Sequence, residues 1–137
     1  MSNVRPEGEG ELLPELVGTW RVTRFDDRDS EDLPWEPLLP PHGDGVVVYD
    51  EQGLWAVQIY AAARDGEQAF YVGYYGRGSV HDVVREDGVV RGNLVVDVEG
   101  ASSQDNLEYA DRPIEITADR VVIGDQRTWI REAVRLR

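Results

Sequence analysis

The feature that most constrains this chain is a succession of short β-forming segments that begins near Gly45 and continues almost to the C-terminus. Segments rich in valine, isoleucine, tyrosine and tryptophan are separated by turn residues, and no stretch has the apolar spacing of a convincing helix. Residues 46–49 and 54–60 flank a turn that ends in Gly53, which is a clear hairpin signal. About eight such strands at even spacing are typical of an up-and-down barrel or a sandwich.

The other predicted strands follow the same rule of apolar runs bounded by turn residues. Residues 16–25 alternate with period two, so Trp20 and Val22 share one strand face. Further strands are predicted at residues 69–76, 80–84, 89–98, 112–117, 120–123 and 127–136. The pattern predicts an all-β chain. It does not choose between barrel and sandwich, and it does not say which strand faces point inward.

One domain is expected, because the chain has 137 residues and shows no internal repeat. We expect residues 1–11, which are polar and contain glycine, to form a disordered tail. Residues 12–137 then form the barrel domain. Residues 26–45 combine a charged run with several prolines and interleaved apolar side chains, which forbids regular structure. Such a loop either closes over a barrel as a lid or packs on its outer wall, and both interpretations stay open.

Composition excludes several classes of function. The chain has no cysteine, and its 14 basic residues are all arginine, so disulfides, thiolate nucleophiles and Schiff-base lysines are excluded. A net charge of −13 argues against nucleic acid and against anionic membrane surfaces. His42 and His81 are far apart in sequence, and we expect no metal and no cofactor. Neither a signal peptide nor a membrane span is visible, which predicts a cytoplasmic location.

A family resemblance rests on segments in order along the chain. They are Leu16-Val17-Gly18-Thr19-Trp20, the hairpin from Gly45 to Ile59, Tyr71-Val72-Gly73-Tyr74-Tyr75 with Val80-His81, and Thr128-Trp129-Ile130-Arg131-Glu132. In this order the chain resembles the bacterial lipocalin-like domain family of the calycin superfamily. The resemblance implies a single up-and-down antiparallel β-barrel of about eight strands. It also implies that Trp20 plugs the closed end of the barrel, with Arg131 in cation–π contact over its indole.

The aromatic residues are numerous enough to line a ligand cavity. The chain has four tryptophans and six tyrosines, and buried hydroxyl groups require hydrogen-bond partners. We expect ligand contacts from Trp35, Trp55, Gln58, Tyr60, Tyr71, Tyr74, Tyr109 and Trp129. The candidate catalytic residues are His81, whose imidazole can transfer protons near neutral pH, and Tyr75, which can polarise a carbonyl. A hydrogen-bonded place in the barrel wall is the plainer interpretation of His81.

Three functions remain open. The resemblance implies a cofactor-free enzyme that folds a polyketide-, polyene- or terpenoid-like intermediate in its cavity and promotes cyclisation or isomerisation. The alternative is a non-catalytic intracellular carrier or sensor of a small hydrophobic ligand. A structural or oligomerisation module is the third, and a cavity of roughly 300 Å³ or more would argue against it. The expected partner is a small hydrophobic molecule, with no nucleic acid and no membrane, and a homodimer is left open.

Overall fold

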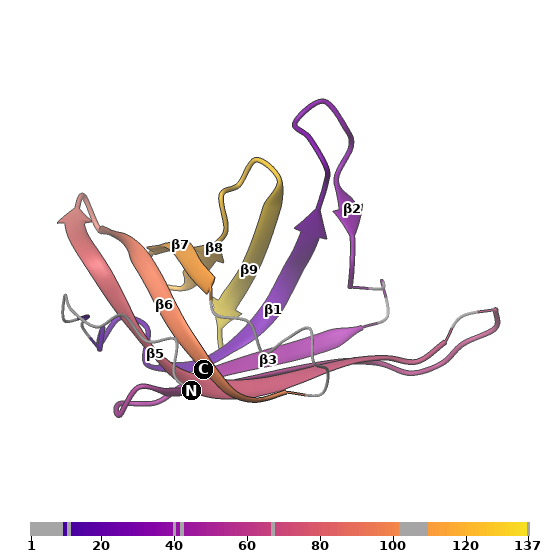
Figure 1. The fold of residues 1–137 in the computed structure, drawn as a ribbon, viewed down its shortest axis with the longest axis horizontal. Helices are drawn as coiled ribbons and strands as arrows, with labels where there is room; N and C mark the ends of the chain where they lie inside the picture. Colours follow the sequence, from indigo (N-terminus) through magenta and orange to yellow (C-terminus); the bar gives the residue numbers. More distant parts are fainter. Residues whose placement is uncertain are drawn as a thin grey trace.

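The computed structural model describes residues 10, 12–39, 41, 43–66, 68–101 and 110–136. Their strands are β1 (Gly18–Asp27), β2 (Glu36–Pro37), β3 (Asp44–Tyr49), β4 (Leu54–Ala61), β5 (Phe70–Glu86), β6 (Val89–Ala101), β7 (Ala110–Ile116), β8 (Arg120–Ile123) and β9 (Trp129–Arg135) (Figure 1). The predicted tail, apart from Gly10, and the predicted ligand residue Tyr109 lie outside the described residues.

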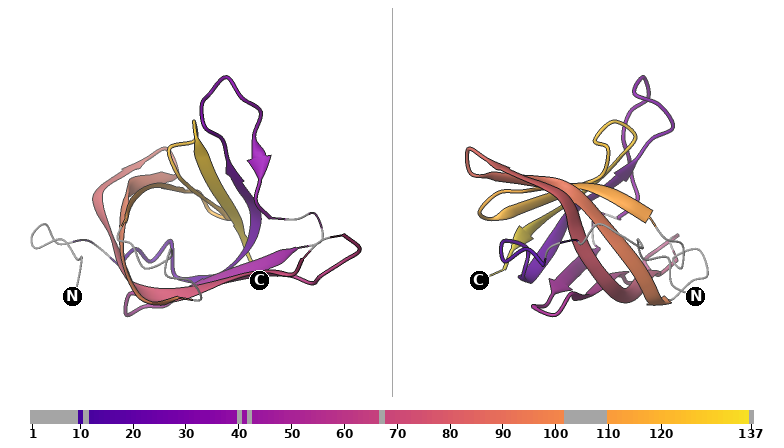
Figure 2. Two further views of the ribbon diagram at one scale, coloured as in Figure 1. Left: turned by 45° about the vertical axis from the view of Figure 1, so that its right-hand side comes forward. Right: turned by 60° about the vertical axis from the view of Figure 1, so that its left-hand side comes forward.

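The strands form one antiparallel sheet that closes on itself. From β3 to β9 each strand pairs with the next along the chain, β1 pairs with β3, and β9 returns to β1. The short strand β2 pairs only with the end of β1, so the closed barrel itself has eight strands. Figure 2 shows this ring and the β1–β2 hairpin that rises away from it. The predicted all-β, up-and-down barrel is therefore confirmed, and the sandwich is excluded.

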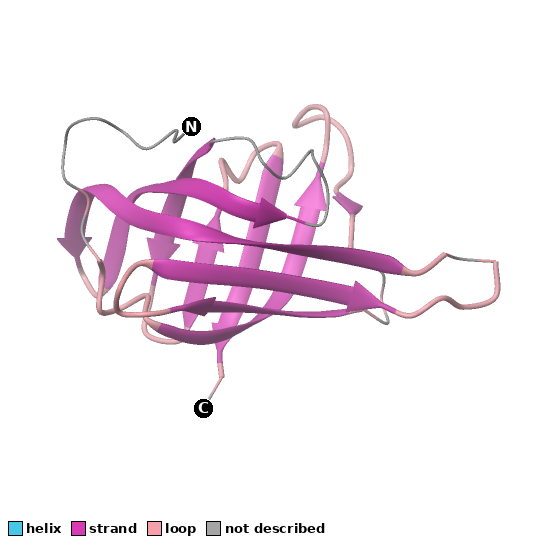
Figure 3. Cartoon of the chain, turned by 60° about the horizontal axis from the view of Figure 1, so that its bottom comes forward, coloured by secondary structure: helices cyan, strands magenta, loops and turns pink. Residues whose placement is uncertain are grey.

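Strand β5 is a single strand of 17 residues where the sequence predicted two. It pairs with β4 near its start and with β6 near its end, and the β4–β5 hairpin extends beyond the rest of the sheet (Figure 3). A strand this long follows a closed barrel only by bending, and register shifts occur at Tyr75/Gly76 and at His81/Val84. At the first shift a Cβ on Gly76 would lie 2.0 Å from the Asp97 carbonyl oxygen, so only glycine fits there.

Burial along β4 and β5 shows which strand faces point inward. In β4, Trp55, Val57 and Ile59 are buried, whereas Tyr60 is 55% exposed. Each inward residue of β4 pairs with an inward position of β5, for example Val57 with Tyr74. The more apolar face of each strand therefore lines the interior, as expected where burial of apolar surface drives the register.

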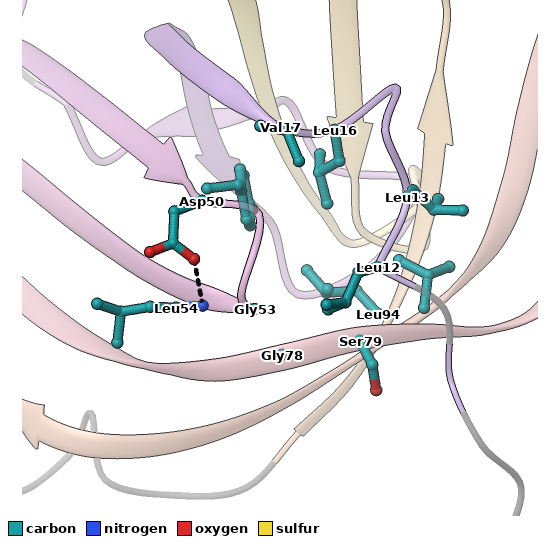
Figure 4. Close-up of a pocket in the computed structure, with 12 residues that line it drawn as sticks. Leu12, Leu13, Leu16, Val17, Asp50, Gly53, Leu54, Gly78, Ser79 and Leu94 are labelled. Carbon is teal, nitrogen blue, oxygen red and sulfur yellow. Dashed lines mark hydrogen bonds between the residues drawn. The ribbon is translucent and has the colours of Figure 1, made fainter.

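One end of the barrel is plugged by residues that precede β1. Leu13 and Leu16 are 2% and 5% exposed, and a turn joins them through a hydrogen bond of 3.0 Å from the Leu16 amide to the Leu13 carbonyl. Figure 4 shows these leucines beside Gly53 and Leu94, and the space left among them is only ≈ 20 Å³. The same view shows the Asp50 carboxylate accepting from the Leu54 amide at 3.0 Å, which closes the adjoining β3–β4 turn.

Trp20 completes this plug, but its cation–π partner is Arg135 and not the expected Arg131. The guanidinium of Arg135 lies 4.2 Å from the centre of the fully buried Trp20 ring. In the β1–β9 register Trp20 pairs with Arg135, whereas Arg131 pairs with Phe25. Because Phe25 is five residues further along β1, Arg131 is roughly 15 Å away along the strand. The expected partner of Trp20 was therefore wrong by four residues along β9.

Gly18, the glycine of the G-x-W segment, makes the Arg135 contact possible. Its φ is +138°, and a Cβ there would lie 2.8 Å from Arg135 Nη1. The guanidinium is then free to donate to the carbonyls of Val17 at 2.9 Å and Glu15 at 2.6 Å. The Trp20 indole donates to the Leu16 carbonyl at 3.0 Å. The plug is thus a closed set of satisfied polar groups around buried apolar side chains.

Candidate functional site

The barrel interior beyond the plug is incompletely filled. A partly open cavity of ≈ 50 Å³ remains there, and every strand of the barrel contributes to its wall. The apolar part of that wall is Val22, Phe25, Val47, Trp55, Val57, Ile59, Leu94, Val96, Val121, Ile123 and Ala133. Tyr49 and Leu94 border both this cavity and the small space under Leu12 and Leu13, so they form its floor above the plug.

The volume of the cavity limits what it can contain. At ≈ 50 Å³ it is well below the roughly 300 Å³ that would argue against a structural or oligomerisation module. It has room for a few water molecules or one compact chemical group. A larger ligand must extend through the opening or displace side chains of the wall.

Arg112 is the polar residue that stands out in the wall. It lies on β7 on the same face as Ile114 and Ile116, which are 3% and 1% exposed, so strand alternation directs it into the barrel. The residue is partly buried. Within the part of the chain that the structure describes, it forms no hydrogen bond and no ion pair, and its charge acts on Tyr49.

Tyr49, Tyr74 and Trp55 lie in the same cavity wall as Arg112. Burial raises the pKa of the Tyr49 phenol well above its usual range, the positive charge of Arg112 opposes this shift, and Tyr74 adds to it. Tyr49 therefore keeps its proton and can donate it to a ligand. Trp55 and Tyr74 meet edge to face, with ring centres 5.1 Å apart.

The Trp55 indole nitrogen is a further hydrogen-bond donor in the cavity wall. It is buried, and among the described residues it has no hydrogen-bond partner. It faces Gly78, where a Cβ would lie 3.2 Å away. Buried polar groups in proteins are nearly always hydrogen-bonded, so an orphan of this kind requires an explanation.

The charged residues at the edge of the cavity are satisfied by the protein itself. Arg131 Nη1 donates to the Asp27 carboxylate at 2.7 Å and to the Asp26 carbonyl at 3.0 Å, and its guanidinium lies 3.8 Å from the Phe25 ring centre. Glu132 accepts from Arg24 and Arg120. These residues hold the β1–β9 wall together and are not free to bind a ligand.

Of the predicted ligand residues, Trp55 and Tyr74 lie in the cavity wall, where a ligand inside the barrel would touch them. Gln58, Tyr60 and Tyr71 lie on the outer face of β4 and β5, and Tyr71 is 53% exposed. The expectation that these three line the cavity was wrong, because both strands turn their more apolar face inward.

Trp35 and Trp129 are outside the cavity wall. Trp35 lies just before β2, with the guanidinium of Arg28 at 4.0 Å and that of Arg24 at 5.1 Å from its ring centre. The described part of this loop runs beside β1, where the Leu38 amide donates to the Phe25 carbonyl at 2.8 Å. Trp129 begins β9 and lies 5.3 Å from the Arg131 guanidinium. Cation–π contacts, rather than a ligand, account for both indoles.

The expected catalytic pair, Tyr75 and His81, lies on the outer face of β5. Tyr75 is 50% exposed, and its ring covers Gly100, where a Cβ would approach the ring to 2.6 Å. His81 Nε2 lies 3.1 Å from Ser79 Oγ, and Gly10 packs over both side chains. Neither residue reaches the cavity. Among the described residues no group of three or more histidines, aspartates or glutamates could hold a metal ion.

Sequence reasoning missed Arg112 and Tyr49. A usable signal was present, because Arg112, Ile114 and Ile116 alternate on one strand face and an arginine in an apolar row is unusual. Tyr49 likewise ends the row of valines in β3. Both signals needed the inward direction of the strands, which the pattern left open.

The described residues contain no helix long and apolar enough to cross a bilayer. Comparisons with protein families, with curated proteins and with solved structures find no match for this chain.

Proposed function

We propose that the protein binds a small, largely apolar molecule, or the end of one, in the barrel cavity. The observation that carries this proposal is the contrast in filling along the barrel. One end is plugged to a residual space of ≈ 20 Å³, whereas the adjoining interior keeps a partly open cavity of ≈ 50 Å³ whose wall is mostly apolar. Native interiors are close-packed, so space that opens to the outside marks the most suitable place for a ligand.

The positions of the candidate residues favour ligand binding without catalysis. The pair expected to be catalytic, Tyr75 and His81, is on the outer face of the barrel and out of reach of a molecule inside it. The groups that do face the cavity, such as Tyr49 and Arg112, are suited to orienting and holding a ligand. A carrier or sensor needs only these features.

Native mass spectrometry of the protein isolated from its natural host tests the proposal. We expect a mass above that of the polypeptide, which is lost on denaturation and releases one small apolar compound. Isothermal titration with 1-octanol should show saturable binding as well. Absence of both a copurified compound and 1-octanol binding would overturn the proposal and favour a purely structural barrel.

A matched pair of variants locates the bound molecule. Ile123→Trp places an indole in the cavity wall and should abolish 1-octanol binding. Val134→Trp adds the same side chain at a position of β9 that is 38% exposed, and it should leave binding unchanged. Equal binding by both folded variants would show that the molecule does not occupy the cavity.

Cofactor-free cyclisation or isomerisation is the second candidate, and the Tyr49–Arg112 pair supports it. A phenol and a guanidinium beside an apolar surface can polarise a carbonyl group and hold a flexible substrate in a reactive shape. Incubation of the copurified compound with fresh protein separates the two candidates. Conversion faster than in buffer supports catalysis, and recovery of the unchanged compound supports binding alone.

A further inference from the structure

We propose that the cavity selects molecules that carry a carboxylate, and that Arg112 is the residue that binds it. This inference deepens the proposed function and rests on it. The inferred ligand is a monocarboxylate with a short apolar or aromatic body. The proposed function, by contrast, requires only an apolar molecule. The argument starts from a comparison of the arginines that point into the barrel.

Strand alternation directs Arg112, Arg131 and Arg135 inward, and the three differ in their hydrogen-bond partners. Arg135 stacks on Trp20 and donates to backbone carbonyls, and Arg131 donates to Asp27. Arg112 has no such partner among the described residues. A guanidinium presents five N–H donors and stays charged at every physiological pH. Leaving it unpaired beside apolar walls costs free energy that a bound anion would recover.

Further hydrogen-bond donors line the same cavity as Arg112. Tyr49 keeps its hydroxyl proton, and the buried Trp55 indole nitrogen lacks an acceptor in the described part of the chain. Glu132 also lines the cavity, but its carboxylate is already paired with Arg24 and Arg120. A wall with surplus donors fits a ligand that brings acceptor oxygens, and a carboxylate matches a guanidinium by accepting two parallel hydrogen bonds.

The size and polarity of the cavity restrict the rest of the ligand. A volume of ≈ 50 Å³ accommodates a carboxylate and the first carbons of its chain. Most of the remaining wall is apolar and includes Val22, Phe25, Val121 and Ile123. The protein as a whole carries a net charge of −13, so its overall electric field does not attract anions. Selection of a carboxylate must therefore come from direct contact with Arg112.

Titration calorimetry with a matched pair of probes, octanoate and 1-octanol, tests this inference. The two probes share the alkyl chain and differ in the charged head. We expect the natural protein to bind octanoate about tenfold more tightly than 1-octanol, or better, because hydrogen bonds to charged groups are among the strongest that proteins form. Arg112→Leu should remove this preference and retain the binding of 1-octanol.

Two further variants keep the experiment decisive. Arg91→Leu removes the same charge from the outer face of β6, where Arg91 pairs with Glu115, and it should keep the preference. Arg112→Gln preserves polarity and substitutes for Arg112→Leu if the latter fails to fold by circular dichroism.

The outcomes separate this inference from the proposed function. Equal affinity for the two probes in the natural protein overturns the carboxylate inference and leaves the cavity as a binding site. A preference for octanoate that survives both Arg112 substitutions overturns the assignment to Arg112. Failure of both probes to bind, together with the absence of a copurified compound, overturns the proposed function itself.

Discussion

The two ends of the barrel interior use the same chemical groups in opposite ways. At the closed end Arg135 stacks on Trp20 and donates to the carbonyls of Val17 and Glu15. In the cavity Arg112 lies near Tyr49 but has no partner within the described residues. Both are inward-pointing arginines beside an aromatic ring, on strands of one small barrel.

This difference teaches how to separate structural from functional polar groups. An arginine whose hydrogen bonds end on the protein contributes to folding, and nothing remains for a ligand to satisfy. An arginine left without partners costs stability, and such groups in native proteins gather at functional sites. The comparison therefore predicts opposite effects on stability for the same substitution at the two ends.

The largest expected effect is at the closed end, from Trp20→Ala. Trp20 is fully buried in the plug and packs with Leu13 and Leu16, so truncation leaves a large cavity and an unsatisfied carbonyl at Leu16. We expect a loss of about 3–5 kcal/mol in the free energy of unfolding, measured by urea denaturation. A loss below about 1 kcal/mol would show that the plug contributes little to folding.

The arginine comparison itself gives the next largest effect. Arg135→Leu removes hydrogen bonds that join the residues before β1 to the end of β9, and we expect it to cost about 1.5–3 kcal/mol. Arg112→Leu removes a charge that no described residue pairs from a mostly apolar wall, and we expect an unchanged or slightly increased stability. Urea denaturation of both variants measures the difference. Equal destabilisation would show that Arg112 has structural partners, and the contrast between the two ends would fail.

The fold was largely predictable from the sequence, because strands of alternating polarity separated by turn residues repeat along most of the chain. Strand β5 was split in two, since Gly76 and Gly78 resemble a turn. In the folded barrel they lie where β5 crosses β6 closely and bends. The short strand β2 could not be foreseen inside a proline-rich loop.

The site was predictable only in part. Trp55 and Tyr74 lie in the cavity wall, whereas Tyr60, Tyr71 and Tyr75 lie on the outer face of β4 and β5. A strand has two faces, and aromatic residues occur on both faces of β5, so residue type alone could not select the inner one. The mistaken pairing of Arg131 with Trp20 has a different cause: it followed from the family resemblance, and the sequence does not mark the β1–β9 register in which Trp20 pairs with Arg135.

The stability of the protein in acid extends the comparison. The β8–β9 turn contains a carboxylate, that of Asp125, whose hydrogen bonds all come from the protein's own described residues. Burial opposes ionisation of Asp125, but hydrogen bonds from the Thr128 hydroxyl and from the amides of Arg127, Thr128 and Trp129 outweigh it and lower the pKa. A carboxyl group with a lowered folded-state pKa stabilises the protein above its unfolded pKa of about 3.9. That contribution is lost as pH falls through the folded pKa.

We therefore expect Asp125→Ala to cost about 1–2 kcal/mol at pH 7. The difference from the natural protein should shrink as the pH is lowered below about 4, where the natural carboxylate begins to be protonated in the unfolded chain. Urea denaturation between pH 7 and pH 3 measures this convergence. A difference that stays constant over the whole range would mean that the charge of Asp125 contributes nothing.

The smallest expected effect concerns Tyr49, which lines the cavity together with Arg112. Its pKa is raised by burial, so the folded protein keeps this proton at pH values where the unfolded chain, with a tyrosine pKa of about 10, loses it. The unfolded state then binds fewer protons, and stability must fall as pH rises above about 10. Tyr49→Phe removes this contribution and should make the decline shallower by up to about 1 kcal/mol between pH 10 and pH 11.

Arg112 connects this pH dependence to the cavity. Its charge opposes the shift in the Tyr49 pKa, so Arg112→Leu raises that pKa further. Because the folded protein already keeps this proton up to pH 11, Arg112→Leu should leave the alkaline loss of stability as it is in the natural protein. Tyr60→Phe on the outer face serves as the matched control for Tyr49→Phe. Urea denaturation at pH 9, 10 and 11 compares these variants with the natural protein. A decline that Tyr49→Phe and Tyr60→Phe change equally would show that Tyr49 is not shielded from water. Arg112 would then face an already hydrated space, and the reason for expecting it to seek an anion would disappear.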